Sequence, residues 1–493
     1  MPASGVLRCL VLCGGLALGG CATMATFTRP EGDGGWSAAR RQEELGQRAA
    51  VAGVVFNATP VAVTEPTPSI PSQLNLAAAL ALAATHNRLI AEADTFVASA
   101  GEHVVDVRGR LLPNTTGQGR YTWYTDSLTT SAALPPGLLP AAPPSFDIKT
   151  RDAGFGTVNG TLSLPIDLSG ELRHALSAAQ AGYRGEQARA WATNLEQQTL
   201  VVRSYFDLLE ALRLREVTQQ TLALYREQLA TAQSRFDNGR VTKNQLLVVQ
   251  VALRNAEQQL LQRDLAIERA RWTLNQVIGV AIDAATDVED VTSNPEVPGV
   301  DEALRMSHTN NPALRSLLEE QQRFEETVSS LERSRLPRFA AGGAVDYSSS
   351  NIVEPQRVGS GFTGFSWDLG TDWRREAQIA DAKVAADRNR IVVERTLREI
   401  EAAIRSTQLA AQERLAAFTT AATAVGQAEE NLRIRQQQFE VGRADSEDVL
   451  EANALLAQQR AVLATALYQA HTRRAELQQL IGLPLDELVL QSR

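Results

Sequence analysis

Two segments of the chain, FDNGRVTKNQLL (Phe236–Leu247) and FEVGRADSEDVL (Phe439–Leu450), align without a gap at a separation of 203 residues. The same separation carries the alignment on to VIG at Val277–Gly279 and LIG at Leu480–Gly482. Self-similarity at a fixed period is the signature of a repeated structural unit. The last part of each half of the chain is therefore a copy of the other.

Further pairs of residues extend the repeat toward the N-terminus. Asn87 aligns with Asn311 at a separation of 224, and Asp167 aligns with Asp368 at a separation of 201. The first copy therefore holds about 23 additional residues between these landmarks. We place this excess around Ala132–Pro144 (AALPPGLLPAAPP), whose prolines and glycine predict a loop.

Each copy has the same predicted order of elements: two moderate helices, a β-like hairpin, a very long helix and a further long helix. In the first copy, residues 72–299, the helices are expected at Ser72–Ala84, Arg88–Arg110, Ser169–Asp237 and Thr242–Ile278. In the second copy, residues 300–483, they are expected at Asp301–His308, Pro312–Arg335, Gly370–Glu440 and Ser446–Ile481, with a tail at 484–493.

The long helices have the pattern of coiled coils. Apolar residues in Thr242–Ile278 follow 3-4 spacing, and only Arg263 interrupts the stripe. Such a stripe requires a partner helix. A helix of about 65 residues is near 100 Å long at 1.5 Å per residue, far beyond the globular norm. Rods of this kind cannot bury themselves alone, so they must pair within the chain and with other subunits.

Glycines mark the turns between the paired long helices. Gly239 and Gly442 stand where a helix ends and a left-handed residue is needed. After the second turn, Ser446 is the expected start of the last helix, because Glu447 and Asp448 behind it place negative charge in the first turn.

Four segments alternate small or polar residues with apolar and aromatic ones, which predicts β-strands. They are Thr115–Ser127, Arg151–Pro165, Pro337–Ser349 and Arg357–Asp368. Each is long enough for a transmembrane β-strand of roughly 9–11 residues. Four strands cannot close a barrel, so several copies would have to pool them. The alternative is a small soluble sheet that caps a helical bundle.

Aromatic residues gather in these strand-like segments, although the whole chain is only 5% aromatic. They are Tyr121, Trp123, Tyr124, Phe362, Phe365 and Trp367. Aromatic girdles at a membrane boundary would explain them. A packed hairpin core explains them equally well.

The overall charge limits the partners. The chain has 48 Lys and Arg against 57 Asp and Glu, which gives a net charge of −9. Nucleic-acid binding needs a basic surface, so nucleic acid is excluded as the main partner.

The N-terminus indicates export. Residues 1–20 contain Arg8, a short apolar run and two glycines, which is typical of a signal peptide rather than a membrane span. The sequence LGGC at Leu18–Cys21 resembles a bacterial lipobox, in which Cys21 becomes the lipidated first residue. An ordinary signal peptide, with Cys21 incidental, is the alternative. Residues 21–71 are rich in Gly, Pro, Thr and Ala and are predicted to form an extended tether.

Together, the lipobox, the repeat and the segment Phe439–Ala452 (FEVGRADSEDVLEA) resemble the outer-membrane efflux proteins, the TolC-like channels. The resemblance covers about Ser72 to Leu483. It implies a mainly α-helical homotrimer with a twelve-stranded membrane β-barrel and a periplasmic helical tunnel. It also implies an outer-membrane exit duct of a tripartite efflux or type I secretion system, which receives substrate from an inner-membrane pump through a periplasmic adaptor.

The resemblance implies a role for two acidic residues. Asp448 and Glu451 match the pair that rings the periplasmic aperture in the family, and three chains would bring six carboxylates to one axis. Such a ring would favour cations over anions. The alternative is that they are first-turn acids that stabilise a helix. The Tyr and Arg of the family's closing latch are replaced here by Phe439 and Ala444. Gln245 is the facing site in the first copy, and Arg443 or Arg240 is a possible substitute.

No enzymatic motif is found in the sequence. The five histidines have no metal-ligand spacing, and there is no nucleophile elbow or phosphate-binding loop. We therefore expect no enzyme activity, no metal and no cofactor apart from a covalent lipid on Cys21. A periplasmic coiled-coil scaffold or adaptor lipoprotein without a pore remains the alternative, although it gives no reason for two matching β-hairpins.

Overall fold

The computed structural model describes residues 71, 73–133, 145–291, 297–368 and 373–485, all within one compact unit, Thr67–Arg493. The first copy contains α3 (Leu76–His86), α4 (Arg88–Gly109), β1 (Asn114–Trp123), β2 (Leu128–Ala133), β3 (Ser145–Arg151), β4 (Gly154–Ile166), α5 (Glu171–Asp237) and α6 (Lys243–Ile278). The second contains α7 (Val300–Asn310), α8 (Pro312–Arg333), β5 (Arg338–Ser348), β6 (Arg357–Ser366), α9 (Trp373–Glu440) and α10 (Ser446–Ile481). The predicted helices and their order in the two copies are confirmed within a few residues at each end.

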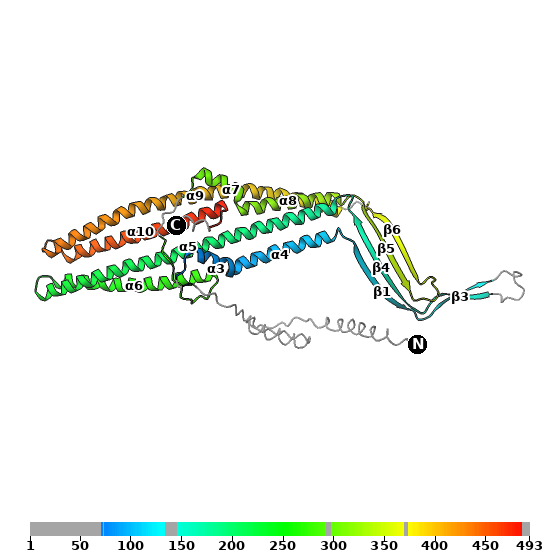
Figure 1. The fold of residues 1–493 in the computed structure, drawn as a ribbon, viewed down its shortest axis with the longest axis horizontal. Coiled ribbons are helices and arrows are strands. Elements are labelled where there is room, and N and C mark those ends of the chain that lie inside the picture. The colour runs from blue at the N-terminus through cyan, green and yellow to red at the C-terminus, as the bar shows by residue number, and fades with distance from the viewer. Residues whose placement is uncertain (1–70, 72, 134–144, 292–296, 369–372, 486–493) are drawn as a thin grey trace. The chain divides into compact units, whose positions relative to one another are not determined.

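The strands β1, β4, β5 and β6 form one antiparallel sheet in that order (Figure 1). Each of these strands is connected along the chain to one helix: α4 leads into β1, β4 into α5, α8 into β5, and β6 toward α9. These four helices form a layer that adjoins the sheet. The helices follow the same order as the strands, because α4 packs on α5, α5 on α8 and α8 on α9. The four-element layer therefore continues from sheet to helix.

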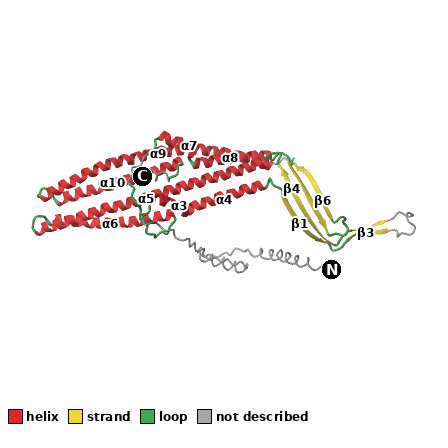
Figure 2. Cartoon of the chain, in the orientation of Figure 1, coloured by secondary structure: helices red, strands yellow, loops and turns green. Residues whose placement is uncertain are grey.

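The long helices form two antiparallel hairpins beyond this layer (Figure 2). α5 packs on α6, α9 packs on α10, and α10 also packs along α5. The predicted seams are confirmed: Val249 and Leu274 are fully buried on α6, as is Leu477 on α10. The stripe of apolar residues at 3-4 spacing is the side that each helix turns toward its partner.

The insertion in the first copy differs from the prediction. A loop was expected at Ala132–Pro144, but β2 and β3 pair as a separate two-stranded ribbon that takes in Ala132 and Ala133. The sequence here is polar with few aromatics, so its alternation was missed. The remainder of that loop prediction, residues 134–144, lies outside the described residues.

The repeat landmarks meet in space. Asn87 caps α4 and also donates from its side chain to the carbonyl of Val277 at 2.9 Å; Asn311 caps α8 and donates to Leu480 at 2.8 Å. Just beyond these carbonyls, Gly279 and Gly482 end α6 and α10 at φ of 78° and 88°. The same junction thus joins three helices in each copy, which explains why these residues recur in the sequence.

Candidate functional site

The four-stranded sheet has two chemically distinct faces. Successive side chains of a strand point to opposite faces, and paired residues share a face. The pairing places on one face, which we call the apolar face, Tyr121, Trp123, Val158, Leu162, Leu164, Ile166, Phe339, Ala341, Val345, Tyr347 and Phe365. The opposite side, the polar face, carries Gln118, Arg120, Thr157, Asn159, Thr161, Arg338, Asp346 and Ser360.

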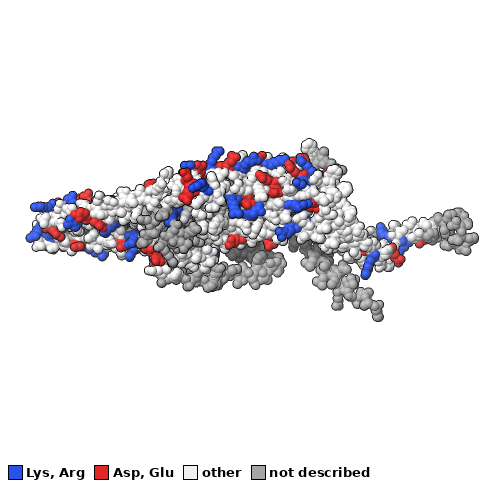
Figure 3. All heavy atoms as spheres, turned by 45° about the horizontal axis from the view of Figure 1, so that its top comes forward, with Lys and Arg blue, Asp and Glu red and all other residues white. Residues whose placement is uncertain are grey.

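The apolar face is not a core. Trp123 is 76% exposed, Phe365 65% and Val345 61% in the single chain. Charged side chains are spread over the helices in Figure 3, whereas few are seen over the four-stranded sheet. Large apolar side chains that remain exposed over a whole face mark contact with lipid or another protein.

Aromatic side chains stand at both ends of the apolar face. Tyr121, Trp123 and Tyr347 lie at the end away from the helices, and Phe339 and Phe365 lie at the helical end. A ten-residue strand such as β1 spans about 25 Å when tilted by about 40°, the height of the lipid-facing band of a membrane barrel. Phe362 is on the polar face and cannot join such a girdle, because it lies three residues from Phe365 and only alternate residues of a strand share a face.

Both borders of the layer lack a partner in the single chain. β1 and β6 are the outer strands of the described sheet, so each has one free edge. The border helices also expose apolar side chains: Phe96 and Val105 on α4, and Val384 and Ile391 on α9, are each 58–67% exposed. Edge strands and apolar faces of this kind are protected by pairing in stable proteins.

None of the helices in the described part of the chain is both long enough and apolar enough to cross a bilayer.

The glycine turns at the tips of the two hairpins are as predicted. Gly239 has φ of 69° and Gly442 has φ of 74°. α10 begins at Ser446, as predicted, and Asp445 before it occupies the cap position. The Asp445 amide donates to Asp448 Oδ2 at 2.9 Å, which fixes the first turn. Ser446 itself is only 3% exposed.

The two candidate aperture acids differ in their surroundings. Besides the Asp445 amide, Asp448 faces Arg435 of α9, with Nη1 to Oδ1 at 3.6 Å. Glu451 is exposed and has no hydrogen bond or ion pair with any described residue. Asp448 therefore has the contacts of a helix-start acid, whereas Glu451 presents an unbalanced charge.

Contacts between the two hairpins lie close to these acids. Gln245 Nε2 donates to Asp445 Oδ1 at 3.0 Å, so the position expected to face the second turn does so. Arg235 Nη1 donates to the carbonyl of Phe439 at 3.0 Å, and its guanidinium lies 3.9 Å from the centre of the Phe439 ring. Leu450 of α10 adds an apolar contact, because it packs into the buried cluster of α5 and α6.

Of these partners, the sequence indicated Gln245 and Phe439 but not Arg235. Arg240 and Arg443, the substitutes considered for the missing latch, are exposed, and the described contacts between the tips come from Arg235 and Gln245. Arg235 precedes the repeated motif and has no distinctive neighbours, so only its cross-hairpin distance identifies it.

Several predictions fall outside the described residues. These are the signal peptide at 1–20, lipid attachment at Cys21, nearly all of the tether at 21–71, and most of the tail at 484–493. Within the described part of the chain, no group of three or more His, Cys, Asp or Glu is arranged to hold a metal ion.

Comparisons with known proteins agree with this geometry. The structure resembles VceC of Vibrio cholerae (17% identity, TM-score 0.69, covering 83% of this chain and 96% of VceC). It also resembles the CmeC channel of Campylobacter jejuni (16%, 0.70, 85% and 89%) and the open MtrE channel of Neisseria gonorrhoeae (16%, 0.67, 85% and 94%). No curated protein matches the chain by sequence.

A model of the family described as outer membrane efflux protein matches residues 79–280 and 303–483, which are the two copies of the repeat. The chain therefore belongs to the outer membrane efflux protein family.

Proposed function

We propose that three copies of this chain form the outer-membrane exit duct of a tripartite efflux or type I secretion system. Pooling β1, β4, β5 and β6 from three chains gives a twelve-stranded barrel, and the long helices continue it as a tunnel into the periplasm. The family and the compared structures are outer-membrane channel proteins rather than enzymes. The duct is passive, and an inner-membrane pump drives transport through a periplasmic adaptor.

The main support for a trimer is that the outer strands β1 and β6 each have an unpaired edge. Closure pairs β6 of one chain with β1 of the next and removes every unpaired edge, which a sheet in lipid requires. The apolar face then meets lipid and the polar face lines the pore. The same closure brings the exposed side chains of α9 onto α4 of the neighbour.

The periplasmic tips form the gate of the proposed duct. Asp448 and Glu451 approach the axis there, and the contacts of Arg235 and Gln245 hold the two hairpins of each chain together. Cys21 carries the only covalent group, a lipid such as palmitate in the outer-membrane leaflet. No cofactor takes part.

Cross-linking tests the closure. Gln118 in β1 and Ser360 in β6 both lie on the polar face, near the middle of their strands. A chain with Gln118→Cys and Ser360→Cys, treated with a short bismaleimide in outer membranes, should give covalent dimers and trimers. Each single variant is the control and should give neither. If the double variant gives intramolecular products alone, the barrel is excluded.

A scaffold lipoprotein without a pore is the competing function. It accounts for the paired helices but not for a sheet with one exposed apolar face. Extraction separates the two: after the lipid anchor is removed, a barrel still needs detergent, whereas a scaffold is released by salt or buffer.

A further inference from the structure

A cavity of about 460 Å³ lies where α4, α5 and α8 run side by side, on the sheet side of the helices. Its floor is formed by small and apolar side chains, which are Ala175, Ala178, Ala179, Gly182, Val107 and Leu331. The volume falls within the range of roughly 300–1,000 Å³ that small-molecule sites occupy. Gly182 keeps the floor low, because a Cβ there would lie 3.2 Å from Arg323 Cδ.

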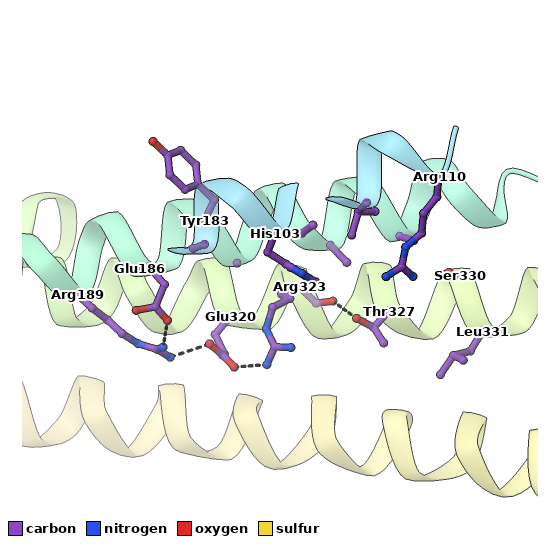
Figure 4. A pocket seen from close by; sticks show the side chains of 16 residues that line it. His103, Arg110, Tyr183, Glu186, Arg189, Glu320, Arg323, Thr327, Ser330 and Leu331 are labelled. Carbon is purple, nitrogen blue, oxygen red and sulfur yellow. Dashed lines mark hydrogen bonds and ion pairs between the residues drawn. The ribbon is translucent and has the colours of Figure 1, made fainter. Parts of the chain in front are cut away.

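The walls of this cavity are cationic. Three arginines and two glutamates line it, which gives a net charge of +1 with His103 neutral. Glu320 is shared by two arginines: it bonds Arg189 at 2.7 Å and also pairs with Arg323. Arg189 pairs in addition with Glu186 (Figure 4). Both glutamates are therefore already neutralised from within the cavity.

Arg110 provides a more available charge. Figure 4 shows its side chain extending from α4 toward α8, near His103. Its ion-pair partner, Asp106, is 2.8 Å away, but both side chains are 60% exposed, so water screens the pair. An anion seated between Arg110 and Arg323 would therefore meet donors that internal carboxylates occupy only in part.

The floor of the cavity continues along α5 toward the polar face of the sheet. Arg338 of that face bonds both carboxylate oxygens of Glu171, at 2.6 and 2.9 Å. Glu171, Ala175, Ala178 and Gly182 follow one another at helical spacing and so form one stripe of α5. In the proposed trimer this stripe faces the tunnel, directly below the barrel.

We infer that this cavity is a binding site for an amphiphilic organic anion on its way through the tunnel. The anionic group lies between Arg110 and Arg323, and the apolar body lies on the floor of α5. The placement in the tunnel rests on the proposed function, whereas the site itself is complete within one chain.

Equilibrium dialysis of naphthalene-1-sulfonate against the full-length protein in lipid nanodiscs tests the site, with empty nanodiscs as the blank. A ligand of this size is expected to bind with Kd on the order of 0.1–1 mM, at one site per chain. Arg110→Gln combined with Arg323→Gln should weaken binding at least tenfold. Arg108→Gln is the matched control, because Arg108 lies on α4 outside the cavity lining, and it should leave binding unchanged.

Two further measurements separate the parts of the site. Ala175→Leu fills the floor without changing any charge and should also weaken binding. Inorganic sulfate and naphthyltrimethylammonium, which lack the apolar body and the negative charge respectively, should bind at least tenfold more weakly. Equal binding by either probe, or unchanged binding by the double variant, overturns the inference. If the protein forms conducting channels but does not bind naphthalene-1-sulfonate, this site is rejected and the proposed duct stands. If the protein binds the sulfonate but forms no conducting channel, the proposed duct is rejected.

Discussion

Asp448 and Glu451 lie three residues apart on α10, but only Asp448 has partners on the described chain. Six carboxylates converging in a trimer would repel one another by a few kcal/mol at an effective dielectric near 20. We predict that Asp448→Asn with Glu451→Gln weakens cation selectivity and block by multivalent cations in single-channel recordings, while trimers still assemble. Because the Glu451 side chain has no partner among the described residues, Glu451→Gln alone should produce most of this effect.

Helix-start acids would behave differently. If both residues only stabilise the first turn of α10, the double variant loses thermal stability and keeps its ion preference. Wild-type cation selectivity in planar bilayers would therefore reject the aperture assignment. Glu447→Gln is the control for a first-turn acid outside the proposed pair.

The helix-ending glycines allow a matched test of packing. A Cβ on Gly279 would lie 2.4 Å from the carbonyl oxygen of His86, and one on Gly482 would lie 2.3 Å from that of Asn310. Gly239 and Gly442 have similar positive φ but no atom within 4 Å of such a Cβ. Alanine at the tips should cost only about 1–2 kcal/mol per chain, from the left-handed backbone.

Gly279→Ala and Gly482→Ala should cost more, because the backbone of the neighbouring helix junction must also move. The temperature at which trimers dissociate on a semi-denaturing gel should fall further for these two variants than for Gly239→Ala and Gly442→Ala. Equal losses at all four positions would mean that the close approach is not important for stability.

At the scale of elements, the two hairpins are joined at their tips by few polar contacts. Arg235→Ala removes a hydrogen bond and a cation–π contact with Phe439, and Gln245→Ala removes the bond to Asp445. Together these contribute about 2 kcal/mol, or roughly thirtyfold in the closed-to-open ratio of one chain. We predict a larger mean single-channel conductance for the double variant.

Arg226→Ala is the control for that variant, since Arg226 is an exposed cation of α5 that forms no ion pair within the described residues. Unchanged conductance of Arg235→Ala with Gln245→Ala would show that these contacts do not restrain the hairpins.

At the scale of the whole molecule, two independent attachments to the membrane are predicted. Cys21→Ser should abolish labelling by radioactive palmitate and block lipoprotein-type processing of the precursor. The barrel should still hold the trimer in the outer membrane, because its apolar face needs lipid. Release of a folded Cys21→Ser protein into the soluble periplasm, measured by fractionation, would contradict the barrel.

The sequence by itself determined the repeat, the order of elements and most of their bounds. Helical seams such as Val249 and Leu274, and turns such as Gly239 and Gly442, are specified by periodicity and by local backbone needs. Even the landmark Asn87 was visible as a repeated residue, although its contact with Val277 was not. Local patterns carry this information because each involves residues within a few turns of one another.

Only the tertiary structure decided which residues serve each site. Arg235 and Phe439 are 204 residues apart, and Arg110 and Arg323 come from different copies of the repeat. The ribbon at Ala132 likewise arises from the pairing of β2 with β3 across the insertion. Such contacts form between side chains of separate helices and strands. Contacts of this kind do not appear as a periodic pattern in the sequence, so they cannot be predicted from it.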